Sequence, residues 1–367
     1  MKATIITFHC TPNFGATLQS VAMFKLFSQY FDNVELLDYR PKKITKQYNY
    51  IYWKRFRGFI ASLLNVPTNL IKYRRFSKYL KQETNLSQKT FYNANDISIK
   101  TDCVVLGSDQ IWNIDIVGFD DLTYFGIIND EHYPTIAYAA SIGNDKVSEA
   151  EKNVYKDVVS KMNSIGVREV KAKEILIDAG VKNEIEVVLD PTLLIPCSEW
   201  RHHEKEITGL PQKYVLVYSL LGYEETYRTA EIISKEKGLP IIEILGRNID
   251  WLDTHKHTKI ATAGPREFIY AIDKASYVVT DSFHGTAFSI IFSKKFLVIP
   301  HKTRSSRMIE LLEKFDLQRC IIHNVETLNI ENVDNIKFNK SLIKKTVEES
   351  LRFITNSVEK LKNDKSS

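Results

Sequence analysis

With 367 residues, the chain is long for a single hydrophobic core, and we expect two domains. A hydrophobic fraction of 44% is ordinary for a globular protein, and no apolar run approaches the ~20 residues that a membrane-spanning helix needs. The N-terminal sequence MKATIITFHCTPN predicts a strand with a polar exit rather than a signal peptide. The four cysteines are far apart and form no CxxC pair, which favours reduced structural thiols in a cytoplasmic protein over disulfides or a zinc site.

The net charge of +5 conceals a basic segment at residues 41–82. The segment holds eleven Lys and Arg, interleaved with Tyr, Trp and Phe, and no Asp or Glu; subtracting these eleven charges from +5 leaves −6 for the rest. Pro67 predicts that the segment forms two helices. It could be a solvated helical insertion with its aromatic rings packed on the domain, an anionic-membrane surface or a nucleic-acid surface. We favour the first two and expect no nucleic acid.

In chain order, the sequence opens with a β-α-β unit. Residues 3–8 predict a strand, a helix follows from Asn13 to about residue 30, and residues 34–38 predict the next strand. Asn13 can cap the helix, and Gly15 would let the backbone approach a ligand. A GxGxxG motif is absent, so the dinucleotide-binding signal is weak.

Later strands of the first half also end in polar residues. Strand 102–106 leads into Gly107-Ser108-Asp109-Gln110-Ile111-Trp112-Asn113, a combination that a purely structural turn rarely needs, so we predict a site there. A short strand at 165–167 ends at Arg168, which is either a surface cation paired with Glu169 or a fork for carboxylate or phosphate. The step from Asp190 to Pro191 predicts an interdomain hinge.

In the second half of the chain, predicted strands and helices again alternate. Strands are predicted at 214–220, 240–245, 277–280 and 295–299, and helices at 224–237, 264–275, 286–292, 308–315 and 341–361. Strand 277–280 leads through Asp281-Ser282-Phe283-His284-Gly285 into a helix, whose free N–H groups would attract an anion. We therefore predict an α/β fold with two Rossmann-like, doubly wound domains facing each other across a cleft, 1–190 and 191–340, followed by a C-terminal helix and tail at 341–367.

Five motifs in this order resemble those of the polysaccharide pyruvyl transferase family, in the branch common in bacterial surface-polysaccharide gene sets. They are Asn13-Phe14-Gly15-Ala16-Thr17-Leu18-Gln19, the 107–113 loop, Val167-Arg168-Glu169, Asp190-Pro191-Thr192-Leu193-Leu194 and Thr280-Asp281-Ser282-Phe283-His284-Gly285-Thr286-Ala287. The resemblance implies a GT-B-like domain arrangement and transfer of pyruvate from phosphoenolpyruvate to a sugar, as a ketal across two hydroxyls. The acceptor would belong to a growing, often lipid-linked, glycan, and the basic segment would hold the enzyme at the inner membrane face.

The resemblance also implies site residues. It carries the phosphoenolpyruvate-binding Arg over to Arg168 and the family's His to His284. Many relatives have an Arg two residues before that His, where this chain has Ser282, so a second cation must come from elsewhere, and Arg307 is our candidate. The predicted donor site consists of Arg168, Ser282, His284, Gly285, Thr286 and Arg307, and the predicted acceptor site of Asn13, Gly15, Ser108, Asp109, Gln110 and Trp112.

His284 and Asp109 are the predicted catalytic residues. His284 would protonate C3 of the enol or hold the phosphate, and Asp109 would orient or deprotonate the acceptor hydroxyl. Phosphoenolpyruvate is a co-substrate, and we expect no other cofactor. We also expect no metal, because the His202-His203 and His255-x-His257 pairs lack Cys or carboxylate partners at useful spacing; we interpret them as surface histidines.

Two other functions stay open. A glycosyltransferase of the same architecture would hold a sugar nucleotide, with its diphosphate at the late helix N-terminus and its ribose on Glu267. A non-catalytic subunit of a glycan-assembly complex is the third hypothesis, against which the intact polar residues at several strand ends argue. We expect a cytoplasmic protein, with peripheral contact at the inner membrane face as a further hypothesis.

Overall fold

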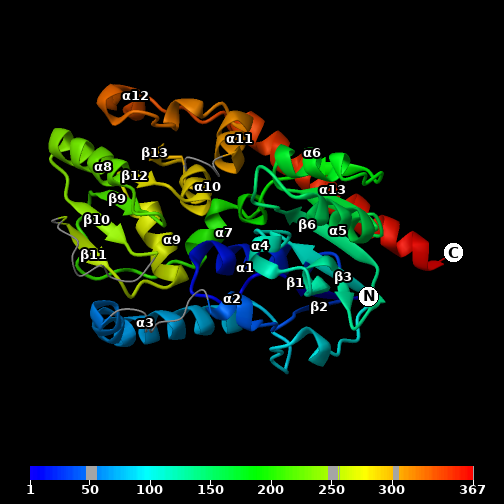
Figure 1. The fold of residues 1–367 in the computed structure, drawn as a ribbon. Helices are drawn as coiled ribbons and strands as arrows, with labels where there is room; N and C mark the ends of the chain where they lie inside the picture. The colour runs from blue at the N-terminus through cyan, green and yellow to red at the C-terminus, as the bar shows by residue number, and fades with distance from the viewer. Residues whose placement is uncertain (47–55, 247–254, 256, 301–305, 367) are drawn as a thin grey trace.

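The computed structural model describes residues 1–46, 56–246, 255, 257–300 and 306–366, with 56–64, 327 and 365–366 as backbone only. Two α/β domains, each built on a fully parallel main sheet, lie side by side (Figure 1). Both sheets are covered by helices on their two faces. The predicted α/β class with two Rossmann-like domains is confirmed.

The first sheet has six parallel strands in the order β2-β1-β3-β6-β7-β8. Alternate residues of each strand face different hydrophobic clusters: Ala3 and Ile5 of β1 enter one, and Ile6 enters the other. Both faces are thus buried, as parallel sheets require. The elements are β1 (Lys2–Ile6), α1 (Phe14–Phe27), β2 (Asn33–Leu36), α2 (Lys42–Lys46), α3 (Phe56–Glu83), β3 (Cys103–Gly107), α4 (Ile114–Val117), β4 (Ile127–Ile128), β5 (Glu131–His132), β6 (Thr135–Ala140), α5 (Glu149–Val159), β7 (Ser164–Val167), α6 (Val170–Asp178) and β8 (Ile185–Val187).

The second sheet has five parallel strands in the order β11-β10-β9-β12-β13. In each sheet the chain reverses its direction of winding beside the first strand, since β1 pairs with β2 and β3, and β9 pairs with β10 and β12. Ligands bind beyond the carboxyl ends of strands at such points. The elements are α7 (Cys197–His202), β9 (Val215–Tyr218), α8 (Glu224–Lys237), β10 (Ile241–Ile244), β11 (Thr258–Ile260), α9 (Pro265–Lys274), β12 (Tyr277–Thr280), α10 (Phe283–Ile291), β13 (Lys295–Val298), α11 (Ser306–Lys314), α12 (Ile330–Asp334) and α13 (Lys340–Ser366).

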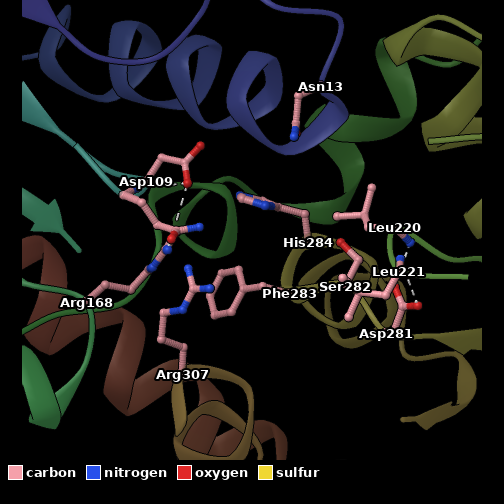
Figure 2. A pocket seen from close by; sticks show the side chains of 11 residues that line it. Asn13, Asp109, Arg168, Leu220, Leu221, Asp281, Ser282, Phe283, His284 and Arg307 are labelled. Carbon is pink, nitrogen blue, oxygen red and sulfur yellow. Dashed lines mark hydrogen bonds and ion pairs between the residues drawn. The ribbon is translucent and has the colours of Figure 1, made fainter. Parts of the chain in front are cut away.

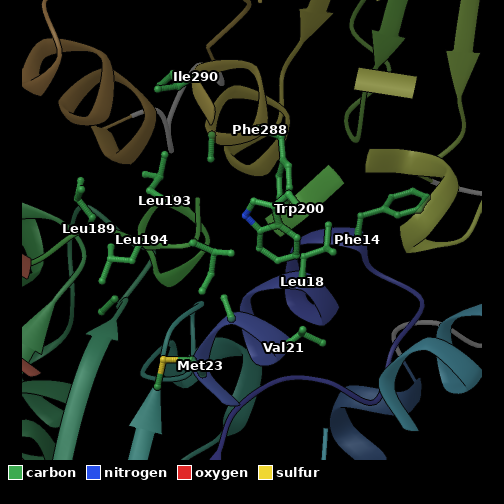
Figure 3. Packing of buried hydrophobic residues seen from close by; sticks show 14 of the residues in the cluster. Phe14, Leu18, Val21, Met23, Leu189, Leu193, Leu194, Trp200, Phe288 and Ile290 are labelled. Atoms are coloured by element: carbon green, nitrogen blue, oxygen red, sulfur yellow. The ribbon is translucent and has the colours of Figure 1, made fainter. Parts of the chain in front are cut away.

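The two domains share one hydrophobic cluster at the base of the cleft. Phe14 of α1 stacks on Phe268 of α9, with ring centroids 4.5 Å apart. Trp200 of α7 meets Phe288 of α10 edge-on at 5.1 Å, and Figure 3 shows it between α10 and Leu18 of α1. Helix α1 is buried almost all round, because both domains cover it.

Helix α3 runs unbroken through Pro67, so the prediction that Pro67 separates two helices of the basic segment is wrong. Pro67 removes one backbone hydrogen bond, and the turns that follow are held by tertiary contacts instead. These contacts reach the second domain: Lys72 Nζ donates to the Leu245 carbonyl at 2.6 Å, and Arg75 donates to the Thr262 carbonyl at 3.0 Å.

More of the inner face of α3 is buried in the same way. Phe76 packs on Phe14, and the Tyr79 hydroxyl lies 2.7 Å from His203 Nδ1. From Asn65 onward the basic segment therefore packs aromatic rings on the protein, as one of the three interpretations expected. Residues 47–55 of the segment lie outside the described residues.

The C-terminal helix α13 crosses back to the first domain (Figure 1, red). Phe353 packs on Tyr138 of β6, and the Ser350 hydroxyl accepts a hydrogen bond from the Leu189 N–H at 3.0 Å. Lys360 Nζ donates to the Asn163 carbonyl. The chain thus passes from the first domain to the second and returns, which ties the two together.

Candidate active site

A cavity of about 240 Å³ opens between the carboxyl ends of the two sheets. Figure 2 shows side chains from both domains pointing into it, with His284 near its centre. Its lining consists of Asn13, Asp109, Gln110, Arg168, Leu220, Leu221, Asp281, Ser282, Phe283, His284 and Arg307. Seven of these are predicted site residues, so the strand ends singled out by sequence meet at one place.

Arg168 follows β7 and is buried, with only 8% of its surface exposed. Its Nη1 donates to Asp190 Oδ2 at 3.1 Å, and the guanidinium also lies 3.7 Å from a Glu169 oxygen and 4.0 Å from an Asp109 oxygen. Burial alone would lower the pKa of Arg168, but the charges of Asp190, Glu169 and Asp109 raise it instead. The guanidinium also lies 4.5 Å from the centre of the Phe283 ring. Arg168 is therefore a permanent cation rather than a surface residue.

Asp190 connects the two predicted donor residues, and sequence reasoning assigned it only to a hinge. Its Oδ2 accepts from Arg168 and from the Ser108 hydroxyl at 2.7 Å, and lies 3.6 Å from His284 Nε2. Its Oδ1 accepts from the N–H and hydroxyl of Thr192. Burial would raise the pKa of Asp190, but the charges of His284 and Arg168 and these hydrogen bonds hold it well below its ordinary value. The Asp-Pro-Thr sequence was the available signal, because Asp followed by Pro and Thr favours this turn.

His284 lies in the first turn of α10, whose N-cap Ser282 accepts from the Gly285 N–H. The ring is buried, and Nε2 has no hydrogen-bond partner among the described residues. A Cβ on Gly15 would lie 2.1 Å from His284 Nδ1. Gly15 thus lets α1 approach His284 across the domain boundary; it does not line the cavity, where we expected it to approach a ligand.

The loop after β9 forms the second-domain wall of the cavity, and no sequence motif identified it. The N–H groups of Leu220 and Leu221 donate to the Asp281 carboxylate at 2.7 and 3.2 Å, and the Ser219 hydroxyl donates to it as well. The Asp281 carboxylate thus holds the backbone of this loop in a turn. The turn leaves the Leu220 and Leu221 side chains exposed at the cavity.

Asp109 faces the cavity from the end of β3. Its backbone has a φ of 68°, in the left-handed region that few non-glycine residues adopt. A carboxylate oxygen accepts from the Gln110 N–H, a local bond that favours this conformation. The same loop places Gln110 at the cavity.

Arg307 enters the cavity from the first turn of α11, on the same side as Arg168 (Figure 2). Ser282, where many relatives are expected to have a cation, also lines the cavity, so Arg307 can supply positive charge to the same space. A second cavity of about 250 Å³ lies beyond Arg168, Phe283 and Arg307, which line both.

Four further predicted site residues are not brought to the cavity lining. Ser108 donates to Asp190, and the Trp112 indole donates to the Tyr124 carbonyl from a fully buried position. The Thr286 hydroxyl donates to the Ser282 carbonyl. Gly285 packs so closely against β12 that a Cβ added to it would lie 2.3 Å from Thr280 Oγ1. These residues support the loops that carry the cavity.

The interpretation of both histidine pairs as surface residues is wrong for one member of each pair, His203 and His257, whose side chains are buried. His203 is buried against Tyr79, and burial with nearby cations lowers its pKa to about 4. His257 Nε2 lies 2.8 Å from the buried carboxylate of Glu243, a partner 14 residues earlier in the chain. Among the described residues, no group of three or more His, Cys, Asp or Glu side chains is arranged to hold a metal ion.

The fold and the position of the cavity define a two-domain protein of the GT-B class. The solved structures of the UDP-GlcNAc 2-epimerase of Methanocaldococcus jannaschii are similar, with TM-scores of 0.54 for the complex with UDP-GlcNAc and UDP and 0.52 for a second structure. Each is 16% identical, and the match covers 97% of this chain and 100% of the other. No curated protein matches the chain significantly.

A sequence model described as "Polysaccharide pyruvyl transferase" matches residues 13–303, which is most of the chain. The chain belongs to the polysaccharide pyruvyl transferase family. The match spans the first-domain loops, Arg168, Asp190 and the start of α10 alike.

Proposed function

We propose that the protein transfers pyruvate from phosphoenolpyruvate to a saccharide, as a ketal across two hydroxyls, with release of phosphate. The observation that carries this proposal is the convergence of Arg168, His284 and Arg307 in one cavity beside the N-terminus of α10. Phosphoenolpyruvate carries a phosphate and a carboxylate, which cations and free helix N–H groups bind.

Arg307 and the first turn of α10 are the proposed phosphate-binding groups. The N–H groups of Phe283 and His284 have no carbonyl of their own helix to donate to, because they lie in its first turn. Three carboxylates already surround Arg168, so we assign to it the smaller carboxylate of the donor rather than the phosphate.

The chemistry assigned to His284 is proton transfer. His284 delivers a proton to C3 of the enol, which makes C2 electrophilic, and the first sugar hydroxyl adds to C2 and loses its proton to the imidazole, directly or by way of Asp109, so that His284 is protonated again. The C2–O bond to phosphate then breaks, and the second hydroxyl attacks C2 and releases its proton to the departing phosphate through His284. One hydroxyl proton thus ends on C3 and the other on phosphate.

The acceptor is proposed to lie against the first-domain wall, where Asn13, Asp109 and Gln110 line the cavity. Amide and carboxylate groups exchange hydrogen bonds with sugar hydroxyls. We propose a sugar of a surface-polysaccharide precursor, carried on a lipid, as the acceptor class, with the enzyme in peripheral contact with the membrane. Among the described residues, none of the helices combines the length and apolar character needed to traverse a bilayer.

The test is an assay with phosphoenolpyruvate and a panel of galactose- and mannosamine-type acceptors, in which phosphate release and product mass are followed. We expect His284→Gln to lower kcat by roughly a hundredfold or more, because it removes the proton donor. Arg307→Ala should mainly raise the KM for phosphoenolpyruvate. The matched control Arg319→Ala, which removes an exposed cation of the same domain, should leave kcat and KM unchanged. Full activity of the His284 variant would refute the site.

A sugar-nucleotide glycosyltransferase remains the alternative, but its proposed ribose ligand is engaged elsewhere. Glu267 is buried, accepts from the Gly264 N–H, and forms ion pairs with Arg75 and Lys205 at 3.1 Å, away from the cavity lining. Thermal-shift measurements with phosphoenolpyruvate against UDP- and GDP-sugars would separate the two functions. Stabilisation by a sugar nucleotide alone would favour the alternative, and no response to any ligand would favour the non-catalytic subunit.

A further inference from the structure

Helix α3 has two faces with different environments. Its inner face, which includes Asn65, Asn69, Lys72, Phe76 and Tyr79, is buried against both domains. Because its interdomain hydrogen bonds and ring contacts hold the helix in place, the opposite face has a defined position on the surface.

That opposite face is apolar at one end and basic at the other. We call it the outer face of α3; it consists of the exposed residues Val66, Pro67, Leu70, Ile71, Arg74, Lys78 and Lys81. The spacing of three and four residues places all of them on one side of the helix. At 1.5 Å per residue the face is about 22 Å long.

The apolar end is unusual for this molecule. Leu70 and Ile71 are 46% and 42% exposed, and Val66 is 36% exposed one turn earlier. The other exposed large apolar side chains of the described residues are either scattered or, like Leu220 and Leu221, line the cavity. A cluster of this kind on a fixed helix needs a partner that accepts apolar groups.

The charge distribution identifies the partner. Between Phe56 and Gln82, α3 carries six Lys and Arg and no acidic residue, and the whole segment 41–82 carries eleven positive charges, whereas the rest of the chain has a net charge of −6. An anionic surface would attract this side of the molecule and repel the remainder, and so orient it. A surface that is anionic at its headgroups and apolar just beneath them is a membrane.

We propose that the outer face of α3 docks on an anionic membrane, with Val66, Leu70 and Ile71 at the acyl boundary and Arg74, Lys78 and Lys81 at the headgroups. Long basic side chains reach headgroups while their stems cover apolar surface. The same helix contacts both domains, so docking would hold the boundary between the domains at a constant distance from the lipid. The inference is independent of the reaction catalysed, because vesicle binding is measured without substrate.

The experiment is sedimentation of the full-length protein with vesicles of phosphatidylcholine alone and of phosphatidylcholine mixed equally with phosphatidylglycerol. We expect binding only to the anionic vesicles and weakening with added salt. Leu70→Ser/Ile71→Ser and Arg74→Ser/Lys78→Ser/Lys81→Ser should each lower the partition coefficient by roughly tenfold or more. Point variants are preferable to deletion, because deletion would also remove the interdomain contacts of Lys72 and Tyr79.

Two matched controls separate this face from general surface properties. Phe119→Ser/Ile177→Ser removes two apolar residues that are 48% and 56% exposed elsewhere, and Lys340→Ser/Lys344→Ser/Lys345→Ser removes three exposed cations from α13. Both should bind vesicles as the unaltered protein does. Equal loss in the controls, or no binding to anionic vesicles at all, would overturn the proposal.

Two further measurements cover the other partners. If a labelled single-stranded RNA binds the protein through the same basic residues while vesicles do not bind, the face is a nucleic-acid surface and the proposal is wrong. If light scattering shows that Leu70→Ser/Ile71→Ser converts a dimer into a monomer without vesicle binding, the face is a contact between two copies. A monomer or unchanged dimer that binds anionic vesicles through α3 supports the proposal.

Discussion

Two buried cations of this protein, Arg168 in the cavity wall and Lys72 on α3, have opposite electrostatic environments. Arg168 lies among three carboxylates, and its pKa is raised. Lys72 is equally hidden but has a carbonyl at 2.6 Å and the Phe14 ring at 5.1 Å, and burial lowers its pKa to about 8. Burial therefore does not determine whether a cation persists; the charge of its neighbours does.

The difference separates a functional site from a structural contact. At the cavity, Asp190, Glu169 and Asp109 keep Arg168 charged at every physiological pH, so a guanidinium cation is held in place in the cavity wall before a ligand binds. At α3, Lys72 donates a hydrogen bond across the domain boundary, and burial of its charge lowers the stability of the fold. Three substitutions test this comparison.

The largest effect on stability is expected from Arg168→Met. The substitution leaves three carboxylates facing one another without their cation, which should destabilise the fold by about 3–5 kcal/mol. Urea denaturation measures this loss, and Arg168→Lys should recover part of it. A loss below that of Lys72→Met would contradict the comparison.

The next effect is expected from Asp190→Asn, which removes the carboxylate shared by Arg168 and His284. We expect a loss of about 3 kcal/mol and a fall in kcat, since His284 loses its orienting partner. Because the folded pKa of Asp190 lies below its ordinary 3.8, its contribution is complete above about pH 4 and disappears as the pH falls through the folded value. Acid titration of stability should therefore be shallower in the variant, and parallel titrations would refute the assignment.

The smallest effect at neutral pH is expected from Lys72→Met. Between pH 8 and 10.5 the unfolded state binds more protons at this lysine than the folded state, so its contribution to stability rises with pH by about 3 kcal/mol in total. The variant should lack this rise and should be as stable as the unaltered protein, or more so, at pH 7. Denaturation between pH 7 and 10 compares the two proteins, and curves with the same slope would show that Lys72 does not titrate as argued.

Several parts of the site could be predicted from sequence because they follow strands. Asn13, Asp109, Arg168 and Ser282 each come after a β-rich run, and parallel strands bring their carboxyl ends to one edge. Hydrophobic periodicity therefore indicated two α/β domains with polar residues at their strand ends, and the family resemblance assigned donor and acceptor roles to these residues. The contact of Asp190 with Arg168 and His284 was not predicted, because an Asp-Pro step at a hinge looks the same in sequence as one whose carboxylate is buried beside a cation.

The sequence by itself determined the strands, most helices and the composition of the loops, because these depend on neighbours along the chain. Only the tertiary structure decided which polar residues reach the cavity and which, like Trp112 and Thr286, are turned inward. It also decided that α3 continues through Pro67 and that α13 returns to the first domain. These features depend on partners that are distant along the chain, whose packing outweighs the local preferences of the residues involved.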